Sequence, residues 1–212
     1  MEIRAYSELY IESAQNVVGH MFDFAVNEIG LQAEGFANLF AASELSKQVE
    51  KGNPKYVVGI SGPELAKKVL EKASIKYKKT KDVMYEDKSP EYWAGWALTY
   101  YQWYRNYPFR YILKAVPFEK LLRMYNIYHE MDIMKLIESM DKMVAECYSD
   151  TALKRFRELI GISQKELAER AGVPLRQIQL FEQRQRDITK AQAATVLKLS
   201  KALFCGMEEL LR

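Results

Sequence analysis

The chain has 212 residues, enough for one large or two modest domains with ordinary hydrophobic cores. Its 31 Lys and Arg nearly balance its 28 Asp and Glu, so the formal net charge is only +3. No run approaches the roughly 18 apolar residues of a membrane-spanning helix, and the two cysteines, Cys147 and Cys205, form no ligand-spaced cluster.

The first 15 residues include an early acid and no continuous apolar core, so we predict no secretory signal peptide. In a chain without such a signal, two distant cysteines indicate reduced thiols. We therefore expect a soluble, cytoplasmic protein that does not associate with membranes.

The positive charge is concentrated in the last third of the chain. Residues 150–212 contain 12 Lys and Arg and 8 Asp and Glu, a net charge of +4, which leaves −1 for residues 1–149. This distribution favours a small polyanion-binding module attached to a neutral partner domain.

Residues 1–149 are predicted to be mostly helical. Apolar residues recur at spacings of three and four over 6–29, which is typical of an amphipathic helix. A second helix is predicted over 33–50, before the Gly-Asn-Pro break at 52–54. The apolar and β-branched residues 55–62 favour a short extended segment.

Proline and glutamate at the start of 63–73 predict a further helix. The polar, aperiodic residues 74–90 then favour a surface loop. We interpret the lysines of this loop as part of a solvated surface, with phosphate contact as the alternative: Lys76, Lys78, Lys79 and Lys81.

Residues 92–107 are the most aromatic part of the chain, and they follow a helix-capping sequence at 89–91. At helical spacing, seven aromatic side chains share one side, with Tyr101 elsewhere: Tyr92, Trp93, Trp96, Tyr100, Trp103, Tyr104 and Tyr107. We interpret this side as a buried core face; a ligand pocket and a protein interface are the alternatives. Two more helices are predicted over 116–128 and 130–148.

The sequence changes character near residue 150. A short helix ending at Gly161 is followed by Ser163, which forms a capping box with Glu166 at the start of the next helix. Gly172 then permits a tight turn, and Pro174 suits the first position of a third helix. Two short helices joined by a glycine-containing turn of about three residues make a helix-turn-helix unit.

Residues 153–211 resemble the Xre/Cro repressor family of DNA-binding domains. The resemblance rests on SQKELAERAGV, which begins at Ser163, and on VLKLSKAL followed by MEELL near the C-terminus. Together with the helical pattern of the first part, it implies an all-α protein. A helical domain, 1–149, would precede a five-helix helix-turn-helix domain, 150–212.

The resemblance also implies a structural ion pair. Arg157 in the first helix of the domain and Glu182 late in the third helix fall at the positions where the family commonly pairs an arginine with a glutamate.

The third helix, 174–184, is the recognition helix that the resemblance places in the major groove of DNA. At about 100° per residue, Ile178 and Phe181 share the side that faces the core, and Leu175 lies between the faces. The opposite side carries the predicted base-reading residues: Arg176, Gln179, Leu180 and Gln183. Arginine matches guanine, glutamine matches adenine, and leucine suits a thymine methyl group.

Predicted phosphate contacts surround this helix. Gln164, at the start of the second helix, matches a family position that contacts phosphate beside backbone N–H groups. The further candidates are Lys165, Gln177, Arg184, Arg186 and Lys190. An ordinary charged surface is the alternative explanation for the basic residues among them.

The sequence departs from the family at two places where glycine is frequent. Residues 183–186 contain no glycine, so either the recognition helix runs longer or a non-glycine residue adopts a left-handed conformation. Phe204 replaces the glycine after the fourth helix. An exposed Phe204, with Cys205 and Met207, would serve dimerisation, whereas a buried one would belong to the core.

The favoured function is a sequence-specific, repressor-like transcriptional regulator that binds double-stranded DNA as a homodimer. Residues 1–149 would supply dimerisation, effector sensing or partner binding, and they are similar to uncharacterised regions of bacterial helix-turn-helix regulators. Residues 172–193 also resemble regulators encoded beside small toxin-like genes. An antitoxin that binds a partner protein is therefore one form of this hypothesis.

The alternative is a protein-interaction adaptor that binds partners through the aromatic helices of 1–149 and has lost DNA binding. An enzyme is disfavoured, because His20 and His129 occur singly, without a ligand spacing such as H-E-x-x-H. Residues 58–62, VGISG, also lack the Lys-Ser/Thr ending of a phosphate-binding loop. We therefore expect no catalytic residue, no metal and no cofactor.

Overall fold

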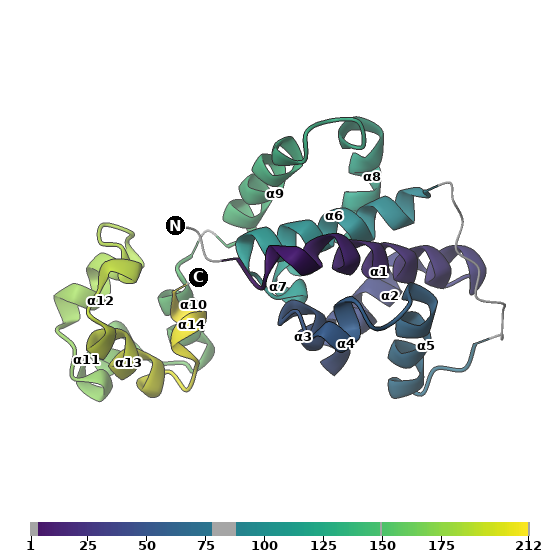
Figure 1. Ribbon diagram of the computed structural model, residues 1–212. Coiled ribbons are helices and arrows are strands. Elements are labelled where there is room, and N and C mark those ends of the chain that lie inside the picture. The colour runs from purple at the N-terminus through teal and green to yellow at the C-terminus, as the bar shows by residue number, and fades with distance from the viewer. Residues whose placement is uncertain (1–3, 78–87, 149, 212) are drawn as a thin grey trace. The chain divides into compact units, whose positions relative to one another are not determined.

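In the computed structural model, the described residues are 4–77, 88–148 and 150–211, and every regular element in them is a helix (Figure 1). The predicted all-α class is therefore confirmed. The chain divides into two compact units, Met1–Cys147 and Tyr148–Arg212, called here the first and second units. Among the described residues, no helix is long and apolar enough to cross a membrane.

Two helices form the centre of the first unit: α1 (Ile11–Asp23) and α6 (Pro90–Arg105) pack side by side (Figure 1). Glycines allow their backbones to approach closely. A Cβ atom at Gly95 would lie 2.8 Å from the carbonyl oxygen of Val18, and one at Gly19 would lie 2.8 Å from the ring of Tyr92. Only a residue without a side chain fits such a crossing.

The other helices of the first unit surround this pair. They are η1 (Glu8–Tyr10), η2 (Phe24–Glu28), α2 (Ala33–Ala42), α3 (Glu44–Glu50), α4 (Pro54–Val57), α5 (Gly62–Lys72), α7 (Phe109–Ala115), α8 (Phe118–Tyr128) and α9 (Ile133–Cys147). Phe22 joins α1 to two of them: its ring stacks on Phe118 at 4.1 Å between centroids and meets Phe36 edge-on at 5.5 Å. Such aromatic pairs add to the stability that burial provides.

Two predicted elements of the first unit were wrong in detail. The single helix predicted over 33–50 is two helices, because Ser43 is extended and its hydroxyl accepts a hydrogen bond from Ser46 N at 3.3 Å, which caps α3. An extended segment was predicted over 55–62, but its first residues, 55–57, belong to helix α4. There the Asn53 side chain accepts from Lys55 N at 3.1 Å, and proline occupies the first turn. Helix α7 was not predicted.

Most of the loop predicted over 74–90, including Lys78, Lys79 and Lys81, lies outside the described residues; Lys76 lies within them.

The aromatic side of α6 is only in part the core face that the sequence favoured. Tyr92 and Trp103 are buried, whereas Trp93, Trp96 and Tyr100 are half-buried. Tyr101, which the sequence placed elsewhere, is fully buried. The close crossing of α1 explains the difference, since Gly95 leaves no room for a side chain and Tyr92 fits only because it faces Gly19 of α1. The rings of Trp93, Trp96 and Tyr100 remain partly exposed to solvent.

The glycine crossing leads to a test of stability. We expect Gly95→Ala to lower the free energy of unfolding of the first unit by about 1–2 kcal/mol, because overpacking outweighs the better helix propensity of alanine. The matched control is Gly35→Ala, where the nearest atom to the new methyl group is Gln32 Oε1 at 3.9 Å. This control should gain about 0.5–1 kcal/mol.

Denaturant unfolding followed by tryptophan fluorescence measures both variants, because Trp93, Trp96 and Trp103, the three tryptophans of the chain, all lie in α6. Equal effects of the two substitutions would contradict the close crossing.

Candidate nucleic-acid interface

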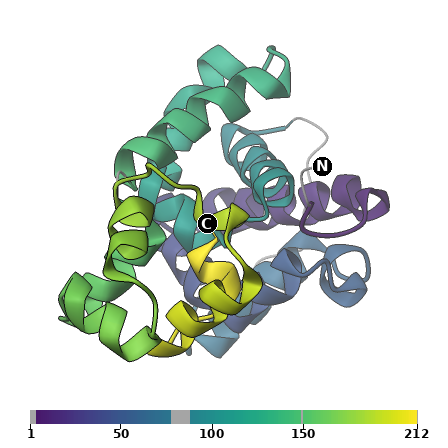
Figure 2. The same ribbon diagram turned by 90° about the vertical axis from the view of Figure 1, so that its left-hand side faces the viewer.

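Over residues 150–211, the second unit contains five α-helices that share one small core. Figure 2 shows the ribbon of these helices from a second side. They are α10 (Ala152–Leu159), α11 (Gln164–Ala171), α12 (Leu175–Glu182), α13 (Ala193–Ala202) and α14 (Met207–Leu210), with the 3-10 turn η3 (Ile188–Lys190) before α13. Every helix contributes at least one apolar side chain to the core, among them Leu153, Leu167, Ile178, Leu199 and Leu210. A core shared in this way fixes the position of each helix in the unit.

Local signals in the sequence determine how α11 and α12 begin. The capping box is present: Ser163 N donates to Glu166 Oε2 at 2.7 Å, and Glu166 N donates to Ser163 Oγ at 3.1 Å. The hydrogen bond from the Ser163 backbone lowers the pKa of Glu166. Gly172 is left-handed, as the tight turn requires. Pro174 is the N-cap of α12 rather than its first residue, so the helix begins at Leu175.

Helix α12 has one side in the core and one side outward. Ile178 and Phe181 are 0% and 2% exposed, so both core assignments are confirmed. On the opposite side, Arg176 and Gln183 are exposed, and Gln179 and Leu180 are half-buried. Leu175 is 37% exposed, at the rim between the two sides. The four residues predicted to read bases therefore lie on the side of α12 that its core residues leave outward.

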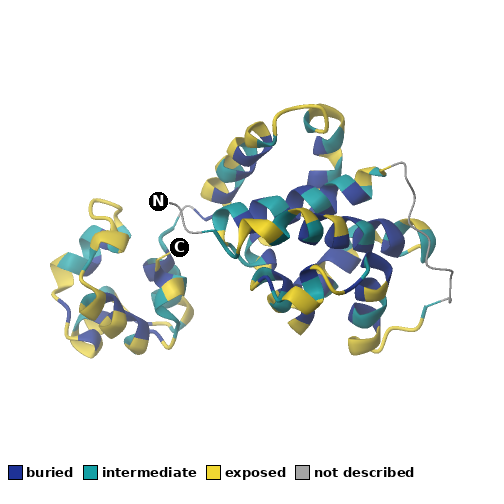
Figure 3. Ribbon diagram, viewed as in Figure 1, coloured by how far each residue is buried: buried dark blue, intermediate teal, exposed yellow. Residues whose placement is uncertain are grey.

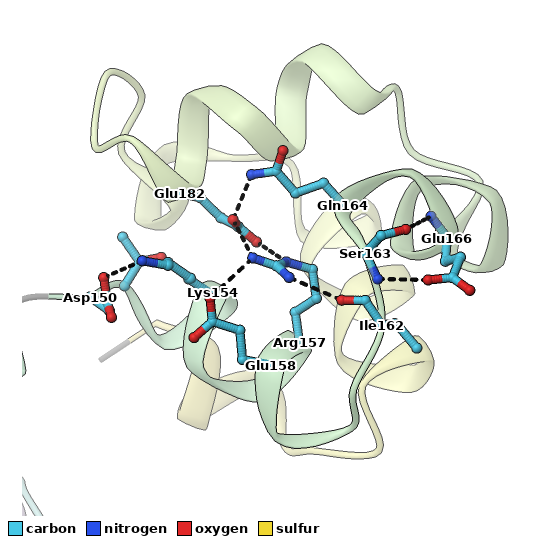
Figure 4. A network of polar contacts seen from close by, with 10 residues as sticks. Asp150, Lys154, Arg157, Glu158, Ile162, Ser163, Gln164, Glu166 and Glu182 are labelled. Carbon is cyan, nitrogen blue, oxygen red and sulfur yellow. Dashed lines mark hydrogen bonds and ion pairs between the residues drawn. The ribbon is translucent and has the colours of Figure 1, made fainter.

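The ion pair between Arg157 and Glu182 is present and largely buried (Figure 4). Arg157 Nε donates to Glu182 Oε1 at 2.7 Å and Nη2 donates to Oε2 at 3.0 Å; the side chains are 12% and 3% exposed. Arg157 Nη1 also donates to the carbonyl oxygen of Ile162 at 2.9 Å. Hydrogen bonding to Glu182 raises the pKa of Arg157. These bonds tie α10, the following turn and α12 together.

Gln164 takes part in the same cluster, which the sequence did not indicate. Its Nε2 donates to Glu182 Oε2 at 2.7 Å, so the side-chain donor faces a carboxylate within the unit (Figure 4). A phosphate needs a donor, and the remaining amide oxygen of Gln164 is an acceptor. The second N–H of Nε2 and the first backbone N–H groups of α11 are the donors that remain at this position.

The other predicted phosphate ligands are distributed around α12. Lys165, Arg186 and Lys190 are exposed, and Gln177 is half-buried. Arg184 has an internal partner, because its Nη2 donates to the carbonyl oxygen of Tyr148 at 3.0 Å. Residues 183–187 together form an exposed segment after α12 (Figure 3).

Helices α12 and α13 both end at a left-handed residue that is not glycine. Arg184 has φ +57° and Phe204 has φ +54°. In each case the residue after it closes the end of the helix: Gln185 N donates to Leu180 O at 3.0 Å, and Cys205 N donates to Ser200 O at 3.1 Å. This is the Schellman pattern, which glycine usually supplies. Of the two possibilities that the sequence left for residues 183–186, the left-handed non-glycine residue is correct and the longer recognition helix is wrong.

This arrangement agrees with the comparison to known families, in which a helix-turn-helix family model matches residues 153–210. These residues are a helix-turn-helix domain of the Xre/Cro type. The match leaves residues 1–152 unassigned, and comparisons of the chain with curated proteins and with solved structures found no match. A helix-turn-helix domain of this kind is a DNA-binding module, which indicates a regulator rather than an enzyme.

Sequence reasoning missed the residues that begin the helix-turn-helix domain. Thr151 Oγ1 accepts from Lys154 N at 3.2 Å and caps α10, and Lys154 Nζ pairs with Asp150 at 2.7 Å. A threonine directly before a helical pattern is the signal that predicts such a cap.

Removal of Arg157 tests the buried ion pair. We expect Arg157→Met to destabilise the helix-turn-helix domain by about 3–5 kcal/mol, because Glu182 is left as a buried carboxylate without its cation. A double replacement of Arg157 and Glu182 by methionine should recover most of this loss. Hydrogen exchange of peptides from the domain, measured by mass spectrometry in the full chain, gives the free energy of opening.

Lys154→Met is the matched control, since it breaks an exposed ion pair on the same helix and should change little. A double variant as unstable as Arg157→Met alone would contradict the role of uncompensated charge.

Phe204 provides a separate test of the left-handed turn. Its side chain is 85% exposed, so its removal costs little burial. Phe204→Gly should stabilise the domain by about 1 kcal/mol through relief of the left-handed strain. Phe204→Ala keeps that strain and should be close to neutral. The same hydrogen-exchange measurement distinguishes them, and equal stabilities of the two variants would exclude strain at this position.

Proposed function

We propose that the protein is a sequence-specific, repressor-like transcriptional regulator whose helix α12 enters the major groove of double-stranded DNA. The observation that carries the proposal is the outward side of α12, where Arg176, Gln179, Leu180 and Gln183 lie opposite the buried Ile178 and Phe181. The chemistry of these four side chains suits base edges. An arginine donates two hydrogen bonds to guanine, a glutamine pairs with adenine, and a leucine contacts the methyl group of thymine.

Phosphate contacts would orient the domain on the duplex. In this proposal Lys165, Gln177, Arg186 and Lys190 contact the backbone on either side of the groove, and α11 contributes the N–H groups near Gln164. Arg184 is a further phosphate contact in this proposal, made by the guanidinium N–H groups that do not donate to Tyr148. These contacts supply affinity without sequence information.

A homodimer on a pseudo-palindromic operator completes the proposal, because one α12 makes few base contacts and two half-sites multiply the specificity. The first unit then supplies dimerisation, effector sensing or the binding of a partner protein. An antitoxin that binds both its operator and a toxin-like partner is the form suggested by the resemblance of residues 172–193.

Substitution on α12 tests this function. The preferred site is first selected by the wild-type chain from random duplex DNA. Arg176→Ala and Gln179→Ala should then each cost about 1–3 kcal/mol on that site and relax the preference at one base position. Fluorescence anisotropy against single-base variants of the site measures both quantities. An unchanged base preference would remove the reading role from the residue tested.

The matched control is Arg186→Ala, an exposed residue outside α12. It should weaken all sequences alike and reduce the slope of log affinity against log salt by about 1. If the wild-type chain selects no duplex even at low salt, the adaptor function replaces the regulator.

A further inference from the structure

A pocket of about 450 Å³ lies in the first unit between α6 and α8. Helix α6 contributes Trp93 and Trp96 to its lining, and α8 contributes Tyr125 and Tyr128. The spacing within each pair is three residues, so both members lie on one face of their helix. The volume falls within the range of small-molecule sites.

The walls of the pocket are aromatic and only half-buried. All four rings retain partial exposure to solvent. Exposed aromatic surface in a hollow is unusual on a folded protein unless something binds there. The four rings can therefore offer apolar area to a ligand.

Contacts between lining residues hold Trp93 and Tyr125 in place. Trp93 meets Tyr125 edge-on at 5.6 Å between centroids, and Tyr125 stacks on His129 at 4.4 Å. His129 Nδ1 lies 2.8 Å from the carbonyl oxygen of Tyr125 and donates to it. Rings that are already fixed lose less conformational entropy when a ligand binds.

One positive charge lies among these rings. Lys88 lines the pocket, and its Nζ lies 4.3 Å from the centroid of the Tyr92 ring. Nζ also lies 3.3 Å from Nε2 of His20. Burial, and then the charge of Lys88, lower the pKa of His20. None of the described residues that line the pocket is acidic.

We propose that this pocket binds a small planar aromatic compound that carries an anionic group, such as an aromatic carboxylate. The ring system stacks against the tryptophans and tyrosines, and the anion pairs with Lys88. A quaternary ammonium ion also binds aromatic walls, but Lys88 repels it. We therefore expect the pocket to prefer an anionic aromatic ligand to a cationic one. The proposal concerns the first unit alone and does not depend on DNA binding.

Three naphthalene probes of matched size test the proposal on the full chain by isothermal titration calorimetry. They are 2-naphthoate, 2-naphthalenemethanol and (2-naphthylmethyl)trimethylammonium. We expect 2-naphthoate to bind about tenfold more tightly than the alcohol and the ammonium probe to bind most weakly. Binding should also change the fluorescence of Trp93 and Trp96.

Two variants assign the contributions. Lys88→Gln alters an exposed side chain, so the fold is kept, and it should remove the preference for naphthoate over the alcohol while binding of the alcohol stays the same. Trp93→Ala should weaken all three probes at least tenfold. Lys72→Gln, an exposed lysine on α5 outside the pocket lining, is the control and should bind naphthoate as the wild type does.

The proposal is overturned if none of the probes binds saturably at millimolar concentration, or if the alcohol or the ammonium probe binds as tightly as naphthoate. It is equally overturned if Lys88→Gln retains the full preference for the anion. Because DNA is absent from these titrations, their failure is independent of any failure to bind an operator.

Discussion

The carboxylate of Glu182 is the group on which the helix-turn-helix domain depends. It is 3% exposed and cannot be buried as a charge without compensation, so it requires the guanidinium of Arg157 within hydrogen-bond distance. Gln164 satisfies a further lone pair of the same carboxylate. Any rotation of α12 that exposed Ile178 would break these bonds. The ion pair and the apolar core therefore favour the same orientation of α12.

Helices α10 to α13 of the domain are each followed by a left-handed residue that closes the helix end, and two of these residues are not glycine. At Gly161 the left-handed residue after α10 is glycine, and Ile162 N donates to Arg157 O at 3.2 Å. Arg184 and Phe204 adopt the same conformation with side chains and retain the same hydrogen-bond pattern. The two residues differ in what their side chains contact. The guanidinium of Arg184 donates a hydrogen bond to the carbonyl oxygen of Tyr148, whereas the side chain of Phe204 extends into solvent. Cys205 and Met207, its neighbours, pack against the core.

In the first unit, the close contact of two helices has a consequence for the surface. Helix α6 turns its small residues toward α1, and Gly95 is the point of closest approach. Trp93 and Trp96 remain partly exposed, and α8 brings Tyr125 and Tyr128 toward them. Tyr92 belongs to both places, since it contacts Gly19 of α1 and lines the pocket.

Features that depend on neighbours along the chain could be predicted from the amino-acid sequence. The capping box of Ser163 and Glu166, the left-handed Gly172 and the buried side of α12 follow from spacing, because each is set within one or two helical turns. The pair of Arg157 and Glu182 was reached through resemblance to a family. The partner of Gln164, the exposure of Phe204 and the position of the aromatic rings of α6 depend on packing between helices and could not be predicted in this way. Periodicity shows which residues share a face, but whether that face is buried depends on which helix packs against it and how closely.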